Sequence, residues 1–146
     1  GFTNNAATLF TNNPYQLKNE SEMNKDKKEI IEKEILEILR FVKNNSNAKF
    51  ITLVIPNPSV VSKKHVNFFK SVGALYLPNF LEVSELARLI NSLSKKYNFE
   101  YLPFYEYLVD IYKVNNAEYF FDTDFHFNKK GNKEISNYII SMTNKN

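Results

Sequence analysis

Apolar residues recur at helical spacing in three parts of the chain. The first pattern, between residues 28 and 43, consists of Ile31, Ile35, Ile38 and Val42, broadened by Leu36 and Leu39. The second starts at Ser84 and consists of Leu86, Leu89, Ile90 and Leu93. The third starts near Asn128 and consists of Ile135, Tyr138, Ile139 and Met142. Because residues three and four apart share one face of an α-helix, these patterns predict three amphipathic helices.

Two segments between the helices are predicted to be strands. Residues 49–55 form a nearly continuous apolar run that ends at Pro56, and Phe99-Glu100-Tyr101-Leu102 is the second predicted strand. Such runs are typical of parallel strands covered on both faces. Residues 60–72 mix apolar and basic positions and favour a further helix. Alternating helices and strands predict an α/β fold with a parallel sheet, in which ligands bind beyond the carboxyl ends of the strands.

Composition narrows the possible classes of protein. A chain of 146 residues, 43% hydrophobic, encloses one ordinary core, so residues 1–146 are expected to be a single domain or part of one. The net charge of +3 is spread among mixed lysines and glutamates, which predicts no nucleic-acid partner. No apolar run reaches the roughly 20 residues of a membrane helix. Without cysteine or a His-x-x-x-His spacing, we expect no metal and no other cofactor.

The segment from residue 122 to residue 132 holds the candidate chemistry. His126 has Asp124 two residues before it and Asp122 four before it. An imidazole can take the proton of a hydroxyl nucleophile while a carboxylate at its other nitrogen fixes the tautomer. Asn128 can cap the following helix, and Gly131 permits a close backbone approach. The alternative is that Asp124 and Asn128 are ordinary turn and cap residues with His126 between them.

The pattern Asp-x-His-aromatic-Asn-x-x-Gly, followed by an apolar-periodic helix, resembles the last block of SGNH hydrolases. It is most similar to the branch reading Asp-x-His-Trp-Asn-x-x-Gly, whose enzymes transfer or remove acetyl groups on cell-envelope polysaccharides. The resemblance implies a three-layer α/β/α, flavodoxin-like fold and a serine esterase or O-acyltransferase. It makes His126 the general base and Asp124 the orienting carboxylate. The commoner family form has its Asp where this chain has Thr123, which leaves Asp122 as the alternative acid.

The resemblance also bears on the other catalytic groups. The opening residues, Gly1 to Asn5, are similar to the Gly-x-Asn-Asp block of the family, which makes Asn4, or failing that Asn5, an oxyanion donor. The family's nucleophile is a serine in a Gly-Asp-Ser-like turn upstream of that block, and no such turn is present. We therefore expect this chain to be the C-terminal part of a longer domain, with the serine on a missing N-terminal segment. The alternative is a degenerate, non-catalytic module that binds a glycan or a protein.

The family resemblance implies an acylated carbohydrate as substrate and a location in the bacterial cell envelope or elsewhere outside the cytoplasm. Two further features have simpler explanations. His65 follows Ser62-Lys63-Lys64 and is predicted to be a solvated side chain. The aromatic residues between Tyr97 and Phe121 are predicted to pack in the core or to line a cleft for a sugar or acyl group. Phe125 and Phe127, which flank His126, are the candidates for contacting such a ligand.

Overall fold

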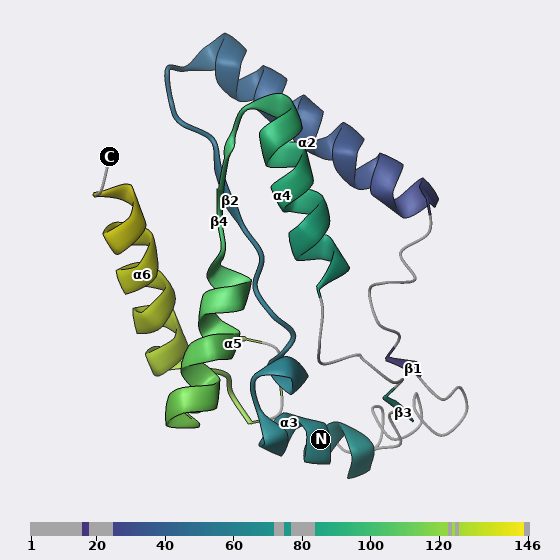
Figure 1. Ribbon diagram of the computed structural model, residues 1–146, viewed down its shortest axis with the longest axis vertical. Helices are drawn as coiled ribbons and strands as arrows, with labels where there is room; N and C mark the ends of the chain where they lie inside the picture. The colour runs from purple at the N-terminus through teal and green to yellow at the C-terminus, as the bar shows by residue number, and fades with distance from the viewer. Residues whose placement is uncertain are drawn as a thin grey trace.

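Helices dominate this mixed α/β chain, whose computed structural model describes residues 16–17, 25–71, 75–76, 84–122, 124 and 126–144 (Figure 1). The helices are α2 (Lys25–Asn45), α3 (Lys63–Ser71), α4 (Glu85–Tyr97), α5 (Phe104–Asn115) and α6 (Lys129–Thr143), with the short 3₁₀ helix η2 at Pro58–Val60. The strands are β1 (Gln16–Leu17), β2 (Ile51–Leu53), β3 (Leu75–Tyr76) and β4 (Glu100–Leu102). The three helices with clear periodicity, α2, α4 and α6, confirm the sequence prediction.

The strands pair in parallel, as expected from their apolar runs. Strand β2 lies beside β4, with Ile51 opposite Glu100 and Leu53 opposite Leu102. Strands β1 and β3 form a second, two-residue parallel pair. The connections that follow the carboxyl ends of β2 and β4 lead to α3 and α5 respectively. Both connections therefore leave the sheet at the same end, where the two strands have their carboxyl termini.

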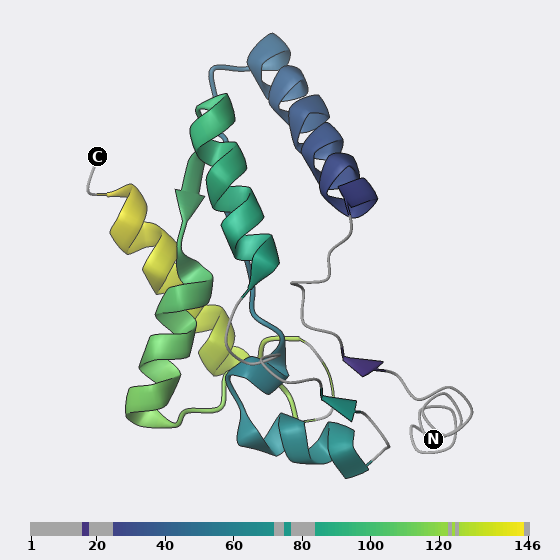
Figure 2. The same cartoon turned by 45° about the vertical axis from the view of Figure 1, so that its right-hand side comes forward.

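Helices cover both faces of the β2–β4 pair (Figures 1 and 2). Side chains of a strand alternate between faces. Ile51, Leu53 and Leu102 pack with a cluster formed by α5 and α6, whose members include Phe104, Leu108 and Tyr138. Phe50, Val54 and Tyr101 belong to the other cluster, with Ile35 and Leu39 of α2 and Ile90 and Leu93 of α4. This two-sided burial explains why residues 50–55, which include β2, are almost continuously apolar rather than alternating.

The sequence prediction was wrong in some details. Ile38 was assigned to the buried stripe of α2, but its side chain is 47% exposed because the buried face is centred on Ile35 and Leu39. Strand β2 covers only Ile51–Leu53 of the apolar run over residues 49–55. The helix expected from residue 60 starts at Lys63, because Asn57 caps a separate 3₁₀ turn that begins at Pro58.

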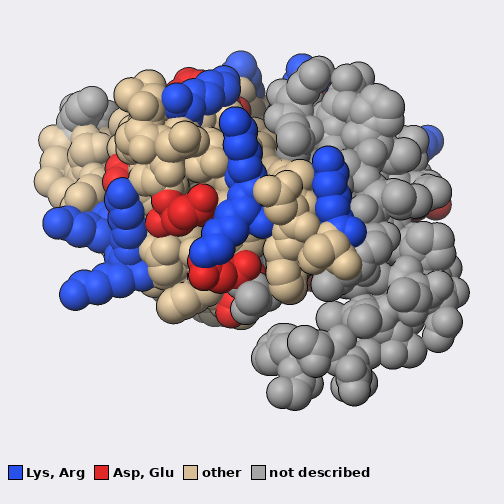
Figure 3. Space-filling view, turned by 90° about the horizontal axis from the view of Figure 1, so that it is seen from below, with Lys and Arg blue, Asp and Glu red and all other residues tan. Residues whose placement is uncertain are grey.

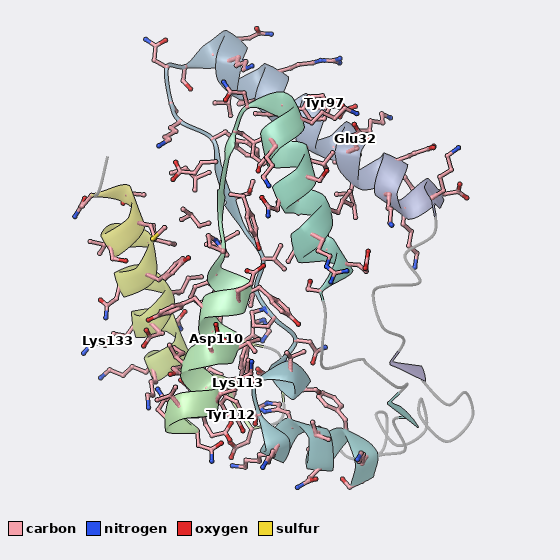
Figure 4. All side chains as sticks on the ribbon, in the orientation of Figure 1. Glu32, Tyr97, Asp110, Tyr112, Lys113 and Lys133 are labelled. Atoms are coloured by element: carbon pink, nitrogen blue, oxygen red, sulfur yellow. The ribbon has the colours of Figure 1, made fainter. Side chains whose placement is uncertain are left out.

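Polar groups define where α4 begins and how its last turn contacts α2. Ser84 caps α4 by accepting a hydrogen bond from the amide of Ala87, as its sequence position suggested. Glu32 of α2 accepts hydrogen bonds from Lys96, at 2.8 Å, and from the hydroxyl of Tyr97, both at the end of α4. Figure 4 shows Glu32 and Tyr97 lying close together on the two helices. The Lys96 ammonium and the Tyr97 hydroxyl hold the pKa of Glu32 below its ordinary value.

Candidate active site

The segment that carries His126 is a short antiparallel hairpin between α5 and α6, here called the His126 hairpin, whose described residues are 119–122, 124 and 126–128. The amide of Phe121 donates to the carbonyl of His126 at 3.0 Å, and the amide of Asn128 donates to the carbonyl of Tyr119 at 2.9 Å. Between these bonds, Phe120 and Phe127 form an isolated antiparallel bridge. Their rings lie with centroids 4.6 Å apart, and the ring of Phe104 meets Phe127 edge-on. Tyr119 and Phe120 are both buried, so the base of the hairpin is part of the core.

Asn128 joins this hairpin to α6 with all of its side-chain hydrogen-bonding groups. Its Oδ1 accepts from the amides of Lys130 and Gly131, at 2.8 and 3.0 Å, which confirms the predicted N-cap. Its Nδ2 donates to the carbonyls of Glu118 and Phe120, both at 3.0 Å. A single amide side chain thereby fixes the hairpin against the start of the helix that follows.

Gly131 makes this arrangement possible. A Cβ at this position would lie 2.2 Å from the carbonyl oxygen of Tyr119 and 2.5 Å from the ring of Phe127. Real side chains do not tolerate such distances, so the first turn of α6 can approach the hairpin only because residue 131 has no side chain. The close approach predicted for Gly131 is confirmed.

At the tip of the hairpin, Asp124 and His126 contact each other twice. Oδ1 of Asp124 accepts a hydrogen bond from the backbone amide of His126 at 2.7 Å. The same oxygen lies 3.4 Å from Nδ1 of the imidazole. This distance exceeds that of a good N–H···O bond, so the carboxylate and the imidazole are in contact without a well-formed hydrogen bond between them. The contact favours a proton on Nδ1 and leaves Nε2 as the basic nitrogen, on a side chain that is 85% exposed.

Asp122, the alternative acid, has a different partner. Its Oδ2 lies 2.5 Å from Nζ of Lys64, on α3. Of the two carboxylates, Asp124 is therefore the one in contact with the imidazole of His126. Of the aromatic candidates, Phe127 is a half-buried packing residue of the hairpin base. Phe125 and Thr123 lie outside the residues that the structure describes, as do the proposed oxyanion donors Asn4 and Asn5.

His65 is not the solvated side chain that its basic neighbours suggested. Its side chain is 0% exposed, with Nδ1 at 3.0 Å from Oγ of Ser62 and Nε2 at 2.6 Å from the carbonyl oxygen of Phe121. The prediction was wrong because Lys63 and Lys64 point away from the face that α3 buries. The spacing of Val61, His65 and Phe69, each four residues apart and all buried, is the sequence signal that identifies this face.

Ser62, His65 and Glu118 lie together without forming a catalytic triad. Ser62 donates to Oε2 of Glu118 at 2.6 Å, so the serine lies between the histidine and the acid. In a triad the histidine lies between the other two. Ser62 is also only 1% exposed, which excludes substrate from its hydroxyl. Ser62, which is buried and bonded to His65 and Glu118, is therefore not a nucleophile for His126.

The surface around the lower ends of α3 and α5 carries charges of both signs. Figure 3, seen from below, shows basic and acidic side chains interleaved there rather than a field of one sign. The hydroxyl of Tyr112, near the lower end of α5 in Figure 4, accepts from the amide of Lys63 and so connects α5 to the start of α3. Lys113 pairs with Asp110 at 3.3 Å. This interleaving is consistent with the low net charge of the chain.

Two other classes of site receive no support from the residues placed in the structure. Across residues 25–71, 84–122 and 126–144, His, Asp and Glu side chains form no group of three that could coordinate a metal ion. The helices in these ranges include none with the length and apolar character that crossing a bilayer requires.

No family model, curated protein or solved structure matches the chain. Its own residues and their geometry are therefore the basis for assigning a function.

Proposed function

We propose that this chain is the His–Asp portion of an SGNH-type serine esterase or O-acyltransferase that acts on acetyl esters of a cell-envelope glycan. The observation that carries the proposal is the Asp124–His126 pair, displayed on a hairpin whose base is buried and whose end is joined to α6 by Asn128. The hairpin is anchored in the core and exposes the imidazole at its tip. This arrangement suits a general base that must take a proton from a nucleophile outside this chain. The parallel strands with helices on both faces are compatible with the three-layer SGNH fold.

The proposed reaction proceeds through an acyl-enzyme. Nε2 of His126 takes the proton of a serine hydroxyl as the serine oxygen attacks the ester carbonyl carbon. Asp124 stabilises the imidazolium, and amide donors such as Asn4 stabilise the tetrahedral oxyanion. The imidazolium then protonates the leaving sugar oxygen as the ester bond breaks, which leaves an acyl-serine. Water releases the acyl group in a hydrolase, whereas the hydroxyl of a second sugar accepts it in a transferase.

The serine would come from a segment of the same domain that precedes this chain. Support comes from the buried state of Ser62 and from the small β2–β4 sheet, which has two strands within the described residues. Support for the rim position of the site comes from the contacts between α3 and the His126 hairpin. Lys64 with Asp122, and His65 with Phe121, join α3, which follows the carboxyl end of β2, to the hairpin that follows α5.

The proposal is tested with the native protein, purified together with any polypeptide that remains bound to it. We expect a fluorophosphonate probe to label a serine, and the protein to hydrolyse a small acetyl ester. His126→Ala should lower turnover by about 10⁴-fold or more, and Asp124→Asn should also lower it strongly, because both act on the same proton transfer. Asp110→Asn is the matched control, and its turnover should stay within about threefold of the wild type since Asp110 is an exposed residue of α5 that pairs with Lys113.

Two results would contradict the enzyme assignment. If His126→Ala retained full turnover, the imidazole would not be the base. If the native protein showed neither labelling nor turnover but bound acetylated glycan, the non-catalytic binding module would be the correct alternative. Circular dichroism of His126→Ala provides the folding control, because an exposed side chain contributes little to the core.

A further inference from the structure

Ser62, His65 and Glu118 form a polar network between α3 and the His126 hairpin, separate from the Asp124–His126 pair, and Ser62 and His65 are buried in it. Nε2 of His65 meets the carbonyl oxygen of Phe121 at 2.6 Å, and its Nδ1 meets Oγ of Ser62 at 3.0 Å. Ser62 in turn meets Oε2 of Glu118 at 2.6 Å. Buried polar groups are costly unless they are satisfied, so a network at the base of this hairpin has a structural effect.

Counting protons shows which ring nitrogen of His65 must be a donor. A carbonyl oxygen can only accept, so Nε2 carries a proton. The contacts from His65 to Ser62 and from Ser62 to Glu118 then need two protons, of which the Ser62 hydroxyl supplies one. The other lies on Nδ1 of His65 or on the carboxyl of Glu118. In either arrangement Nε2 remains protonated, and the bond to Phe121 is maintained.

Phe121 connects this network to the candidate base through its backbone. Its carbonyl accepts from His65, and its amide donates to the carbonyl of His126 at 3.0 Å. The side chain of Phe121 is 54% exposed, so packing alone does not fix the residue. The neighbouring Asp122 pairs with Lys64, which precedes His65 on α3. Helix α3 thus contacts two consecutive residues, Phe121 and Asp122, in the part of the hairpin that lies opposite His126.

We propose that His65 is a positioning residue: it sets the path of the His126 hairpin through Phe121, while Ser62 and Glu118 keep its imidazole oriented. The effect on the hairpin follows from the hydrogen bonds alone, whereas any effect on turnover rests on the proposed function. The role is distinct from catalysis, because a fully buried imidazole touches no substrate.

A pair of substitutions separates the hydrogen bond from the bulk of the side chain. Gln places an N–H donor near the position of Nε2, so His65→Gln should keep the bond to Phe121, whereas His65→Leu removes it. In the full chain, we expect His65→Leu to speed hydrogen exchange at the amide of Phe121 by about tenfold or more, with His65→Gln close to the wild type. Amides in the middle of α4 serve as the internal reference.

A second pair tests the rest of the network. Glu118→Gln supplies a neutral donor to Ser62, which can then donate to Nδ1 of His65, so the hairpin should keep its protection. Glu118→Leu removes the partner of Ser62 and should speed exchange at Phe121. If His65→Leu proves unfolded, Glu118→Leu and Ser62→Ala provide the same comparison, because both leave the donor to Phe121 in place but remove its orientation.

A spectroscopic measurement distinguishes positioning from general stabilisation. The ¹⁵N shifts of the His126 imidazole should indicate the Nδ1–H tautomer in the wild type and in His65→Gln, and a loss of that preference in His65→Leu. Unchanged Phe121 exchange together with unchanged His126 shifts in His65→Leu would overturn the proposal. If these readouts shift as expected while His126→Ala keeps full acetyl-ester turnover in the native protein, positioning holds and the proposed function fails. The reverse combination rejects positioning and leaves the function standing.

Discussion

At the scale of single residues, the junction between the His126 hairpin and α6 depends on the side chain of Asn128 and on the absence of one at Gly131. Asn128 donates to two hairpin carbonyls and accepts from two helix amides. Gly131 lets the backbone of Tyr119 reach the helix. Both roles were predicted from the Asn-x-x-Gly spacing, because capping and close approach are local properties that a short motif encodes.

Gly131→Ala should destabilise the protein, although Ala normally stabilises the interior of a helix relative to Gly. The added Cβ would lie 2.2 Å from the Tyr119 carbonyl, and relieving that overlap requires the hairpin base to move. We expect a loss of about 1–3 kcal/mol in the free energy of unfolding, measured by urea denaturation. Ser136→Ala, at an exposed position of the same helix, is the control and should change stability by less than about 0.5 kcal/mol. Equal stability of Gly131→Ala and the wild type would contradict the close approach.

At the scale of elements, α2 and α4 are joined by polar contacts as well as by their apolar faces. Glu32 accepts from both Lys96 and Tyr97, and its pKa is lowered first by the Lys96 hydrogen bond and then by that of Tyr97. A carboxyl whose pKa is lower in the folded state binds its proton more tightly in the unfolded chain. Its contribution to stability is therefore present above its ordinary pKa and is lost as the pH falls through the folded value.

Glu32→Gln should consequently be less stable than the wild type at neutral pH, with a difference that closes in acid. The ordinary pKa of Glu lies near 4.3, so the difference should be constant from about pH 6 to pH 8 and should shrink below about pH 4. Thermal unfolding of both proteins across this range measures the effect. Glu37→Gln is the control, because Glu37 pairs with Lys33 in its own helix, at 3.9 Å. A Glu32→Gln difference that is the same at pH 3 and pH 7 would rule out the carboxylate as its source.

The sequence pattern predicted α2, β2, α4, β4 and α6, but it did not predict α5 or the two-residue strands β1 and β3. Helices α2, α4 and α6 followed from spacing because a helix needs only local regularity and one apolar face. His65 was placed in solvent because the lysines before it are polar, yet its burial depends on Phe121, which lies 56 residues later. The Asp122–Lys64 pair is similarly non-local, so the sequence could not show that Asp122 contacts Lys64 whereas Asp124 contacts His126. Contacts across long stretches of sequence leave no periodic pattern in a single chain.

At the scale of the whole molecule, the β2–β4 pair lies between two helical clusters. Each of these strands has one strand partner within the described residues. In a parallel pair, alternate amides of each strand point away from the partner, so the outer edges present free hydrogen-bonding groups. If the serine is carried by a preceding part of the same domain, a further parallel strand should add to one of these edges.

That expectation is tested by hydrogen exchange of this chain alone and within the native protein. Amides of β2 or β4 should exchange at least about tenfold more slowly in the native protein, because their outward-facing groups gain hydrogen-bond partners on the added strand. Residues in the middle of α6 are the control, since that helix already packs against α5 through Tyr138 and Phe104 and should exchange alike in both samples. Identical exchange in β2 and β4 would mean that no strand adds to this sheet. The serine would then have to reach His126 from a separate domain or be absent, and the non-catalytic alternative would gain support.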